Sequence, residues 1–365
     1  MGLEVLIEMK KDIPNPKKQD VIPPDMDHVY FEGGGKFPLQ PAELNYSAVN
    51  AWWFAEFAFL AYCHPGFVRL AVKLAGFDRF CFLSGKGTEC MISWNDEVCV
   101  IAFRGTELKS RSALHEMKTD LNALPVPFEL GGKVHGGFLD GLDEIWAGNE
   151  GLEHKIKGLI EEAPDRPIWI TGHSLGGALA ALCFARIPTA TGLYLYGAPR
   201  VGDPTFIRGC EGRPVFRIEN ATDPIPLVPP DIPKIKFNFG DLGVLKFLDW
   251  DGSVLDERPM FVLENHKEGY REAKEMLDAK LRELKHAVSL SKEGFRTSKK
   301  LLKEVDRHNR KHVKDWKTQM KRSLNQFGLN IDQHQPIFYA VKTWNALIDS
   351  ERGHSCPSES EAHVR

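Results

Sequence analysis

The segment from Ile170 to Gly177 reads Ile-Thr-Gly-His-Ser-Leu-Gly-Gly and constrains the fold more than any other part of the chain. A short apolar, β-prone run precedes it, and an alanine-rich helical stretch follows at once. This strand–turn–helix context predicts that Ser174 sits on a sharp, strained turn as a nucleophile. Side chains at Gly172 and Gly176 would collide with the neighbouring strand and helix, which explains why glycine occupies both positions.

Two backbone N–H groups are candidates for holding a developing oxyanion near that serine. The N–H of Leu175 lies at the start of the predicted helix, where the helix dipole also favours negative charge. Thr106 follows a second buried strand, and a hydroxyl and an N–H at the carboxyl end of a strand are well placed to form the other half of an oxyanion hole. The sequence thus predicts donors from two separate turns.

The composition is that of a soluble globular protein, with 42% hydrophobic and 27% charged residues. The sequence has no run of 18 or more apolar residues, so we expect no transmembrane segment. The N-terminus does not read as a secretory signal. The seven cysteines are odd in number and lack zinc spacing, which predicts reduced thiols and a cytoplasmic location. We expect no metal, organic cofactor or nucleic-acid partner.

The central part of the chain alternates between strand-like and helix-like segments. Residues 46–62 form an aromatic, alanine-containing stretch that predicts a buried helix. Strands separated by helices imply a mainly parallel sheet covered by helices on both faces. The fold class predicted is therefore α/β. The candidate strands are 79–83, 89–94, 98–103, 167–171, 192–196 and 214–218.

The composition changes near residue 264. Between Lys267 and Arg322 there are 18 Lys and Arg residues against 9 Asp and Glu, and apolar residues recur at helical spacing. This predicts a charged helical insertion, either a solvated hairpin or a peripheral contact with an anionic lipid surface. The predicted organisation is an N-terminal arm (1–45), an α/β core (46–263), the insertion (264–327), a segment completing the core (328–350) and a polar tail (351–365).

Five ordered motifs together resemble the class 3 lipases, the family of the fungal triacylglycerol lipases. They are FRGT (103–106), VHGGF (134–138), GHSLGG (172–177), YGAPRVGD (196–203) and DPIP (223–226), and the resemblance covers roughly residues 46–262. It implies the α/β-hydrolase fold and a serine carboxylic-ester hydrolase that cleaves acylglycerols or related lipid esters through an acyl-enzyme. The predicted partner is a lipid ester substrate. The resemblance also implies a lid after Thr106, at residues 107–117, for which an ordinary surface loop is the alternative.

Carried over by motif, the resemblance makes Ser174 the nucleophile and Asp223 the acid of a Ser-Asp-His triad, with Thr106 and Leu175 as the oxyanion hole. Chain order also favours Asp223, because the acid of this fold follows a later strand than the nucleophile does. Asp203 also follows a strand and is the alternative acid; its other interpretation is a turn or cap beside Pro204.

The resemblance implies a histidine that comes after the acid on a C-terminal loop and is followed by a tyrosine, and two histidines fit this pattern. His334 is followed by Tyr339 and an apolar segment able to pack on the core, and we favour it. His266 is followed by Tyr270 but begins the charged insertion. Two other functions compete with the lipase interpretation. One is a phospholipase A1 using the same triad, and the other is a catalytically silent scaffold whose histidines lie out of reach of Ser174.

Overall fold

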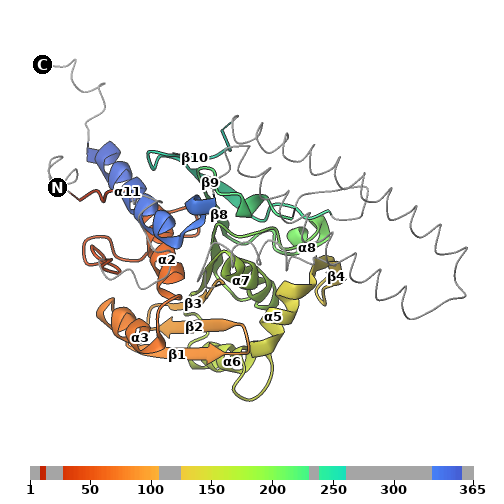
Figure 1. Cartoon of the computed structure of the whole chain (residues 1–365). Helices are drawn as coiled ribbons and strands as arrows, with labels where there is room; N and C mark the ends of the chain where they lie inside the picture. The colour runs from red at the N-terminus through yellow and green to blue at the C-terminus, as the bar shows by residue number, and fades with distance from the viewer. Residues whose placement is uncertain (1–8, 14–27, 107–124, 230–237, 260–330, 356–365) are drawn as a thin grey trace, which may run out of the picture. The chain divides into compact units, whose positions relative to one another are not determined.

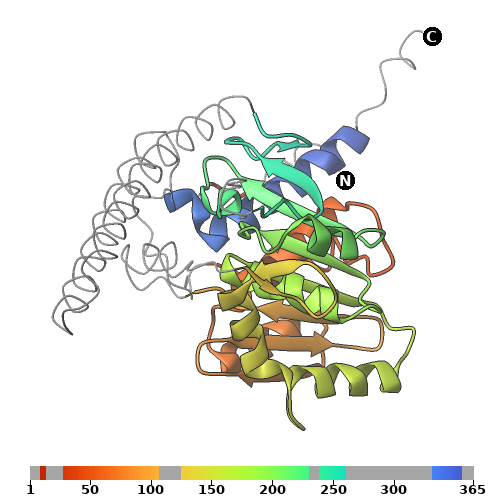
Figure 2. The same cartoon turned by 90° about the vertical axis from the view of Figure 1, so that its right-hand side faces the viewer.

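The computed structural model of the chain describes residues 9–13, 28–106, 125–229, 238–259 and 331–355. Within these ranges, the central sheet has the strand order β1-β2-β3-β6-β7-β8-β9-β10. Strands β3, β6, β7, β8 and β9 run parallel, whereas β1, β2 and β10 pair antiparallel with their neighbours. Figure 2 shows them side by side, from β1 in orange to β9 in teal. The predicted α/β class with a mainly parallel sheet is confirmed.

The strands of the main sheet are β1 (Arg79–Ser84), β2 (Glu89–Trp94), β3 (Cys99–Phe103), β6 (Ile168–His173), β7 (Gly192–Tyr196), β8 (Val215–Asn220), β9 (Val244–Leu248) and β10 (Val254–Leu255). A separate small hairpin pairs β4 (Pro125–Pro127) with β5 (Lys133–His135). The helices are α2 (Ala48–Leu60), α3 (Pro65–Leu74), α5 (Gly136–Trp146), α6 (Leu152–Glu162), α7 (Leu175–Arg186), α8 (Pro204–Gly209) and α11 (Pro336–Ser355), with short 3₁₀ turns η1 (Ile225–Leu227) and η3 (Ile331–His334).

Side chains alternate between the two faces of the sheet, as the period of two along a strand requires. Trp169 of β6 packs into a core with α2 and α11, whereas the next residue, Ile170, packs into a second core with α5 and α7. Figure 1 shows α2 and α11 together on one side of the sheet and α5 and α7 on the other. The sheet is therefore buried on both faces, which explains its continuous apolar strands.

Two helices have ends that differ from the sequence prediction. The helix predicted over 46–62 begins at Ala48, because the side chain of Ser47 accepts a hydrogen bond from the N–H of Asn50. Helix α11 continues to Ser355, inside the tail predicted from residue 351 onward, and an Asp349–Arg352 ion pair lies within this last part.

The core unit consists of two stretches, Met1–Glu257 and Ile331–Arg365, and residues 258–330 form a separate unit. The predicted charged insertion at 264–327 lies outside the described residues. Within the part of the chain that the structure describes, no helix combines the length and apolar character needed to cross a bilayer.

Candidate active site

Ser174 occupies the strained turn between β6 and α7. Its backbone has φ 59° and ψ −130°, a region that residues with a side chain rarely adopt. Its N–H donates to the carbonyl of Tyr196 at the end of β7 (2.9 Å), so the neighbouring strand holds the strained backbone in place. The residue is 2% exposed. The predicted strand–turn–helix context of the serine is confirmed.

The two glycines that flank the turn are required by close backbone contacts. A Cβ on Gly172 would lie 2.3 Å from the carbonyl oxygen of Gly176, and a Cβ on Gly176 would lie 2.2 Å from that of Phe103. Both distances are far inside van der Waals contact. The steric explanation predicted for the glycines therefore holds, and the second contact places the end of β3 directly against the start of α7.

The Gly105–Thr106 turn lies beside the serine because β3 and β6 are parallel neighbours. A Cβ on Gly105 would lie 2.7 Å from the carbonyl oxygen of His173, the residue before Ser174. Leu175 is the first residue of α7, where backbone N–H groups have no partner within the helix. Both predicted oxyanion-hole residues thus follow strand ends at the same edge of the sheet as the serine.

Asp223 follows β8 at that same edge and is buried, with its carboxylate facing donors on several sides. One oxygen accepts from the N–H of Ile225 (2.9 Å). The other accepts from His334 Nδ1 (2.7 Å) and from the Tyr339 hydroxyl (2.5 Å). Asp203, the alternative acid, instead caps α8 by accepting from the N–H groups of Thr205 and Phe206, both at 3.0 Å.

His334 ends the 3₁₀ turn η3 and is fully buried. Its Nδ1 bonds Asp223, while its Nε2 has no hydrogen-bond partner among the described residues. Its ring packs against that of His173, with centroids 4.6 Å apart. The structure therefore assembles Asp223 and His334 next to the residue preceding Ser174, with one imidazole nitrogen left for a further partner. His266 and the lid predicted at 107–117 lie outside the described residues.

His173 and Tyr62 form a contact that the sequence analysis did not anticipate. The Tyr62 hydroxyl hydrogen-bonds His173 Nδ1 at 2.9 Å. A Cβ on Gly105 would lie only 2.0 Å from the oxygen of that hydroxyl. Burial, followed by the nearby His334, lowers the pKa of His173 well below its usual value, so this imidazole is neutral. Tyr62 lies in the turn after α2, more than a hundred residues from His173, and no local pattern links the two.

His135, from the VHGGF motif, has a structural environment. It precedes α5, and its Nδ1 accepts from the N–H of Phe138 (3.3 Å), on whose ring it stacks with centroids 3.8 Å apart. Burial lowers the pKa of His135 to about 4. The ring is therefore neutral at ordinary pH, and only a neutral ring can accept the hydrogen bond from Phe138 at the helix start.

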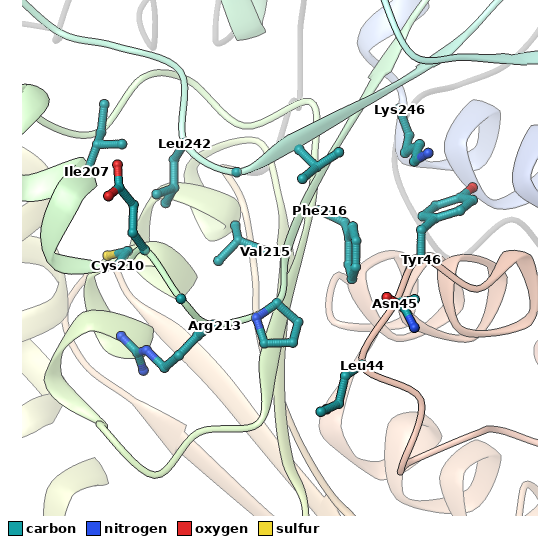
Figure 3. Close-up of a pocket in the computed structure, with 15 residues that line it drawn as sticks. Leu44, Asn45, Tyr46, Ile207, Cys210, Arg213, Val215, Phe216, Leu242 and Lys246 are labelled. Atoms are coloured by element: carbon teal, nitrogen blue, oxygen red, sulfur yellow. The ribbon is translucent and has the colours of Figure 1, made fainter.

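A hollow of about 630 Å³ opens at the opposite edge of the sheet, where β8 and β9 begin. Figure 3 shows Arg213 and Cys210 on one side of it and Tyr46 and Lys246 on the other. Arg213 donates to two carbonyls of the chain, and Lys246 pairs with Asp256. The cations of this hollow are therefore already engaged, and it lies away from the residues at the carboxyl ends of the strands.

Comparisons with known proteins agree with the motifs. Residues 100–232 match the model of the family described as lipase (class 3). A lipase of Rhizomucor miehei is 35% identical over 157 residues, which are 39% of this chain and 41% of that protein. The secreted mono- and diacylglycerol lipase 1 of Fusarium solani is 34% identical over 110 residues, 27% of this chain and 30% of that protein. The chain thus spans less than half the length of these relatives.

Among solved structures, that of the triacylglyceride lipase of Rhizomucor miehei aligns with 26% identity. The alignment covers 54% of this chain and 78% of that chain, with a TM-score of 0.44.

The prediction of a cytoplasmic location is wrong, because the Fusarium solani relative is a secreted enzyme. The cysteine count does not indicate the compartment, for a physical reason. The described cysteines are free, and most of them are buried. Burial raises the pKa of Cys99 to about 12 and that of Cys210 to about 11, so these thiols stay protonated and unreactive. Buried thiols of this kind pack as small apolar groups and do not report the redox state of a compartment.

Proposed function

We propose that the protein is a serine carboxylic-ester hydrolase acting on acylglycerols or related lipid esters, and the match of residues 100–232 to the class 3 lipase model supports this proposal. The observation that carries the proposal is the environment of His334. Its Nδ1 is bonded to a buried carboxylate, and its Nε2 lacks a partner at the strand edge where Ser174 sits. A base with one nitrogen oriented by a carboxylate and the other left for a hydroxyl is what serine activation requires.

In the proposed reaction, His334 Nε2 takes the proton of the Ser174 hydroxyl while its oxygen attacks the ester carbonyl carbon. Asp223 holds Nδ1–H in place and stabilises the imidazolium that forms. The N–H groups of Thr106 and Leu175 donate to the tetrahedral oxyanion; losing one such donor typically costs about 100- to 1,000-fold in turnover. The alcohol then leaves with the proton from His334, and Ser174 carries the acyl group.

Water completes the cycle. His334 takes a proton from a water molecule, whose oxygen attacks the acyl-enzyme; the carboxylic acid leaves and the proton returns to Ser174. The residues for these steps come from the chain itself. Within the described ranges, no group of three or more His, Cys, Asp and Glu side chains could hold a metal ion.

The substrate class rests on the relatives. The Fusarium solani protein is named a mono- and diacylglycerol lipase, which supports an acylglycerol as substrate here. A phospholipase A1 would use the same residues, so the test must compare substrates. The silent-scaffold alternative required both candidate histidines to lie out of reach, and it is disfavoured by the Asp223–His334 bond beside the elbow.

The test is hydrolysis of a short and a long p-nitrophenyl ester by the full chain and by Ser174→Ala, His334→Ala and His266→Ala. We expect activity in the wild type and in His266→Ala, and loss in the other two. Loss in His266→Ala with retention in His334→Ala would move the base to the insertion. No wild-type activity on either ester would favour the scaffold. Dioleoylglycerol against a diacyl phospholipid in mixed micelles then separates lipase from phospholipase A1.

A further inference from the structure

The loop that carries His334 has an unusual connection to the core. The core unit is interrupted by residues 258–330 and resumes at Ile331, only three residues before His334. A connection of this length restrains the positions of the two core residues that it joins only weakly. The loop must therefore be fixed by contacts that it makes itself on its return to the core.

Asn220 contacts this loop directly. It is fully buried at the end of β8, and its backbone carbonyl accepts from the N–H of Asp223 (2.8 Å). Its side-chain Nδ2 donates to the carbonyl of Gln333, the residue before His334, at 2.7 Å. One residue thus holds both the loop of the carboxylate and the loop of the histidine.

The orientation of that amide is dictated by Lys342 of α11. The ammonium donates to Asn220 Oδ1 at 2.7 Å and to the carbonyl of Asp249 at 2.8 Å. Because an ammonium group has no acceptor, the oxygen of the amide must face Lys342, and the NH₂ group must face Gln333. A reversed amide would set NH₂ against an ammonium and oxygen against a carbonyl oxygen.

We propose that Asn220 and Lys342 form an amide clamp, a pair of positioning residues that sets the place of His334 through the carbonyl of Gln333. The proposal rests on the proposed function, in which His334 is the base. The clamp gives the base a fixed position relative to Asp223 that does not depend on the path of the chain between Glu257 and Ile331.

The burial of Lys342 supports a role beyond packing. The residue is 1% exposed, and burial lowers the pKa of its ammonium to about 8, an effect that Asp249 and Asp251 offset only in part. A buried charge is costly, and an apolar side chain of similar length would fill the same space without that cost. The lysine is instead suited to a task that needs a donor with no acceptor capacity.

Asn345, on the same helix, provides the matched control. It is also buried, and its amide makes two hydrogen bonds of similar length, to the N–H (2.9 Å) and the carbonyl (2.8 Å) of Lys11. These contacts tie α11 to residues 9–13 and do not involve the histidine loop. Asn345→Ala therefore removes comparable bonds from α11 without touching the clamp.

The experiment compares Lys342→Met, Asn220→Asp and Asn345→Ala in the full chain, using a short p-nitrophenyl ester and proton NMR of the downfield His334 Nδ1–H resonance, assigned by its loss in His334→Ala. For Lys342→Met we expect kcat to fall about 10- to 100-fold with KM unchanged, because a displacement of about 1 Å has such effects. The resonance should broaden or disappear. Both readouts should stay at the wild-type level in Asn345→Ala.

Asn220→Asp keeps the proposal open to refutation if Lys342→Met fails to fold. The carboxylate preserves the shape and the bond to Lys342, but it places an oxygen against the Gln333 carbonyl, so kcat and the resonance should fall as in Lys342→Met. Wild-type kcat and resonance in either folded clamp variant would overturn the proposal and leave Lys342 a structural residue. If the wild type hydrolyses no ester, the proposed function fails. The His334 Nδ1–H resonance of the clamp variants then tests by itself whether the clamp positions His334.

Discussion

The two halves of the candidate site are held in place by different physical means. The serine half, from β6 into α7, is fixed by backbone contacts so close that glycine is required at Gly172 and Gly176. The histidine half, Asp223 with His334, is fixed by side-chain hydrogen bonds between residues more than a hundred positions apart. Steric constraint leaves its trace in one short local motif, whereas the polar network joins residues that no single local motif contains.

The difference implies different responses to mutation. At the two glycines of the serine half, any added side chain meets backbone, so a substitution there disturbs the fold itself. In the histidine half an isosteric change leaves the shape intact and removes one donor or acceptor, so the chemistry suffers first.

Ser174→Gly should abolish activity and stabilise the protein. Removing a nucleophile of this type costs up to about 10⁶-fold in kcat. The strained backbone at φ 59° and ψ −130° costs a residue with a side chain on the order of 1–3 kcal/mol, which glycine avoids. Glycine also gives more entropy to the unfolded chain, so we expect a net gain of about 1 kcal/mol over Ser174→Ala, measured by urea unfolding.

Ser174→Ala is the control, since it loses the same hydroxyl and keeps the strain. Equal stability of the glycine and alanine variants would mean that the elbow stores no strain, and the local half of the comparison would lose its basis.

Asp223→Asn should lower kcat by about 10⁴-fold with little change in fold, as for the acid of other serine triads. The carboxylate accepts on both oxygens, from Ile225 on one and from His334 and Tyr339 on the other. An amide offers only one oxygen, so at least one of these donors loses its acceptor.

Asp203→Asn is its matched control at the alternative position. Asp203 caps α8, and asparagine is an equally good cap, so activity and stability should both stay near wild type. A large loss of kcat in Asp203→Asn with retention in Asp223→Asn would reverse the assignment of the acid.

His135→Asn should remove part of the acid sensitivity of the fold. Burial lowers the pKa of His135 from 6.5 to about 4, so the unfolded chain binds more protons between these pH values. Its contribution is present above pH 6.5 and is lost as the pH falls toward 4. The shift corresponds to roughly 3 kcal/mol at most. Asparagine keeps an acceptor for the N–H of Phe138, so the helix start survives.

The measurement is the free energy of unfolding at pH 7.5 and 4.5 for the wild type, His135→Asn and His154→Asn, which replaces an exposed histidine on α6. The difference between the two pH values should shrink in His135→Asn alone. An unchanged difference would show that the VHGGF histidine does not couple folding to pH.

What the sequence could predict follows the same division. The turn at Ser174, the Gly105–Thr106 turn and the mainly parallel sheet follow from local patterns of glycine and apolar residues. The contacts of Tyr62 with His173 and of Asn220 with Lys342 could not be predicted, because they join distant residues and Tyr62, Asn220 and Lys342 belong to none of the five motifs. Lys342 lies in an apolar segment where a lysine at helical spacing is expected on the surface, and its burial depends on two acceptors, Asn220 at the end of β8 and Asp249 just after β9.

Tyr62→Phe tests a hydrogen bond to His173, the residue whose ring packs against the histidine half. The Tyr62 hydroxyl bonds His173 Nδ1 and lies against the backbone of Gly105, while the His173 ring packs on His334. Removing the oxygen leaves His173 Nδ1 buried without a partner and frees its ring to rotate, which costs about 1–3 kcal/mol. We expect kcat to fall about tenfold, because both the oxyanion turn and the base lose a fixed neighbour.

Tyr194→Phe is the matched control, since its hydroxyl also makes a single hydrogen bond in the α2 core, to the N–H of Ser47 at 3.3 Å, away from the site. It should lose stability without losing kcat. If Tyr62→Phe behaves in the same way, the halves are positioned independently, and each is held by its own contacts alone. If only Tyr62→Phe loses kcat, the steric half and the polar half share a contact, and the geometry of the base depends on the turn after α2 as well as on the loop that carries it.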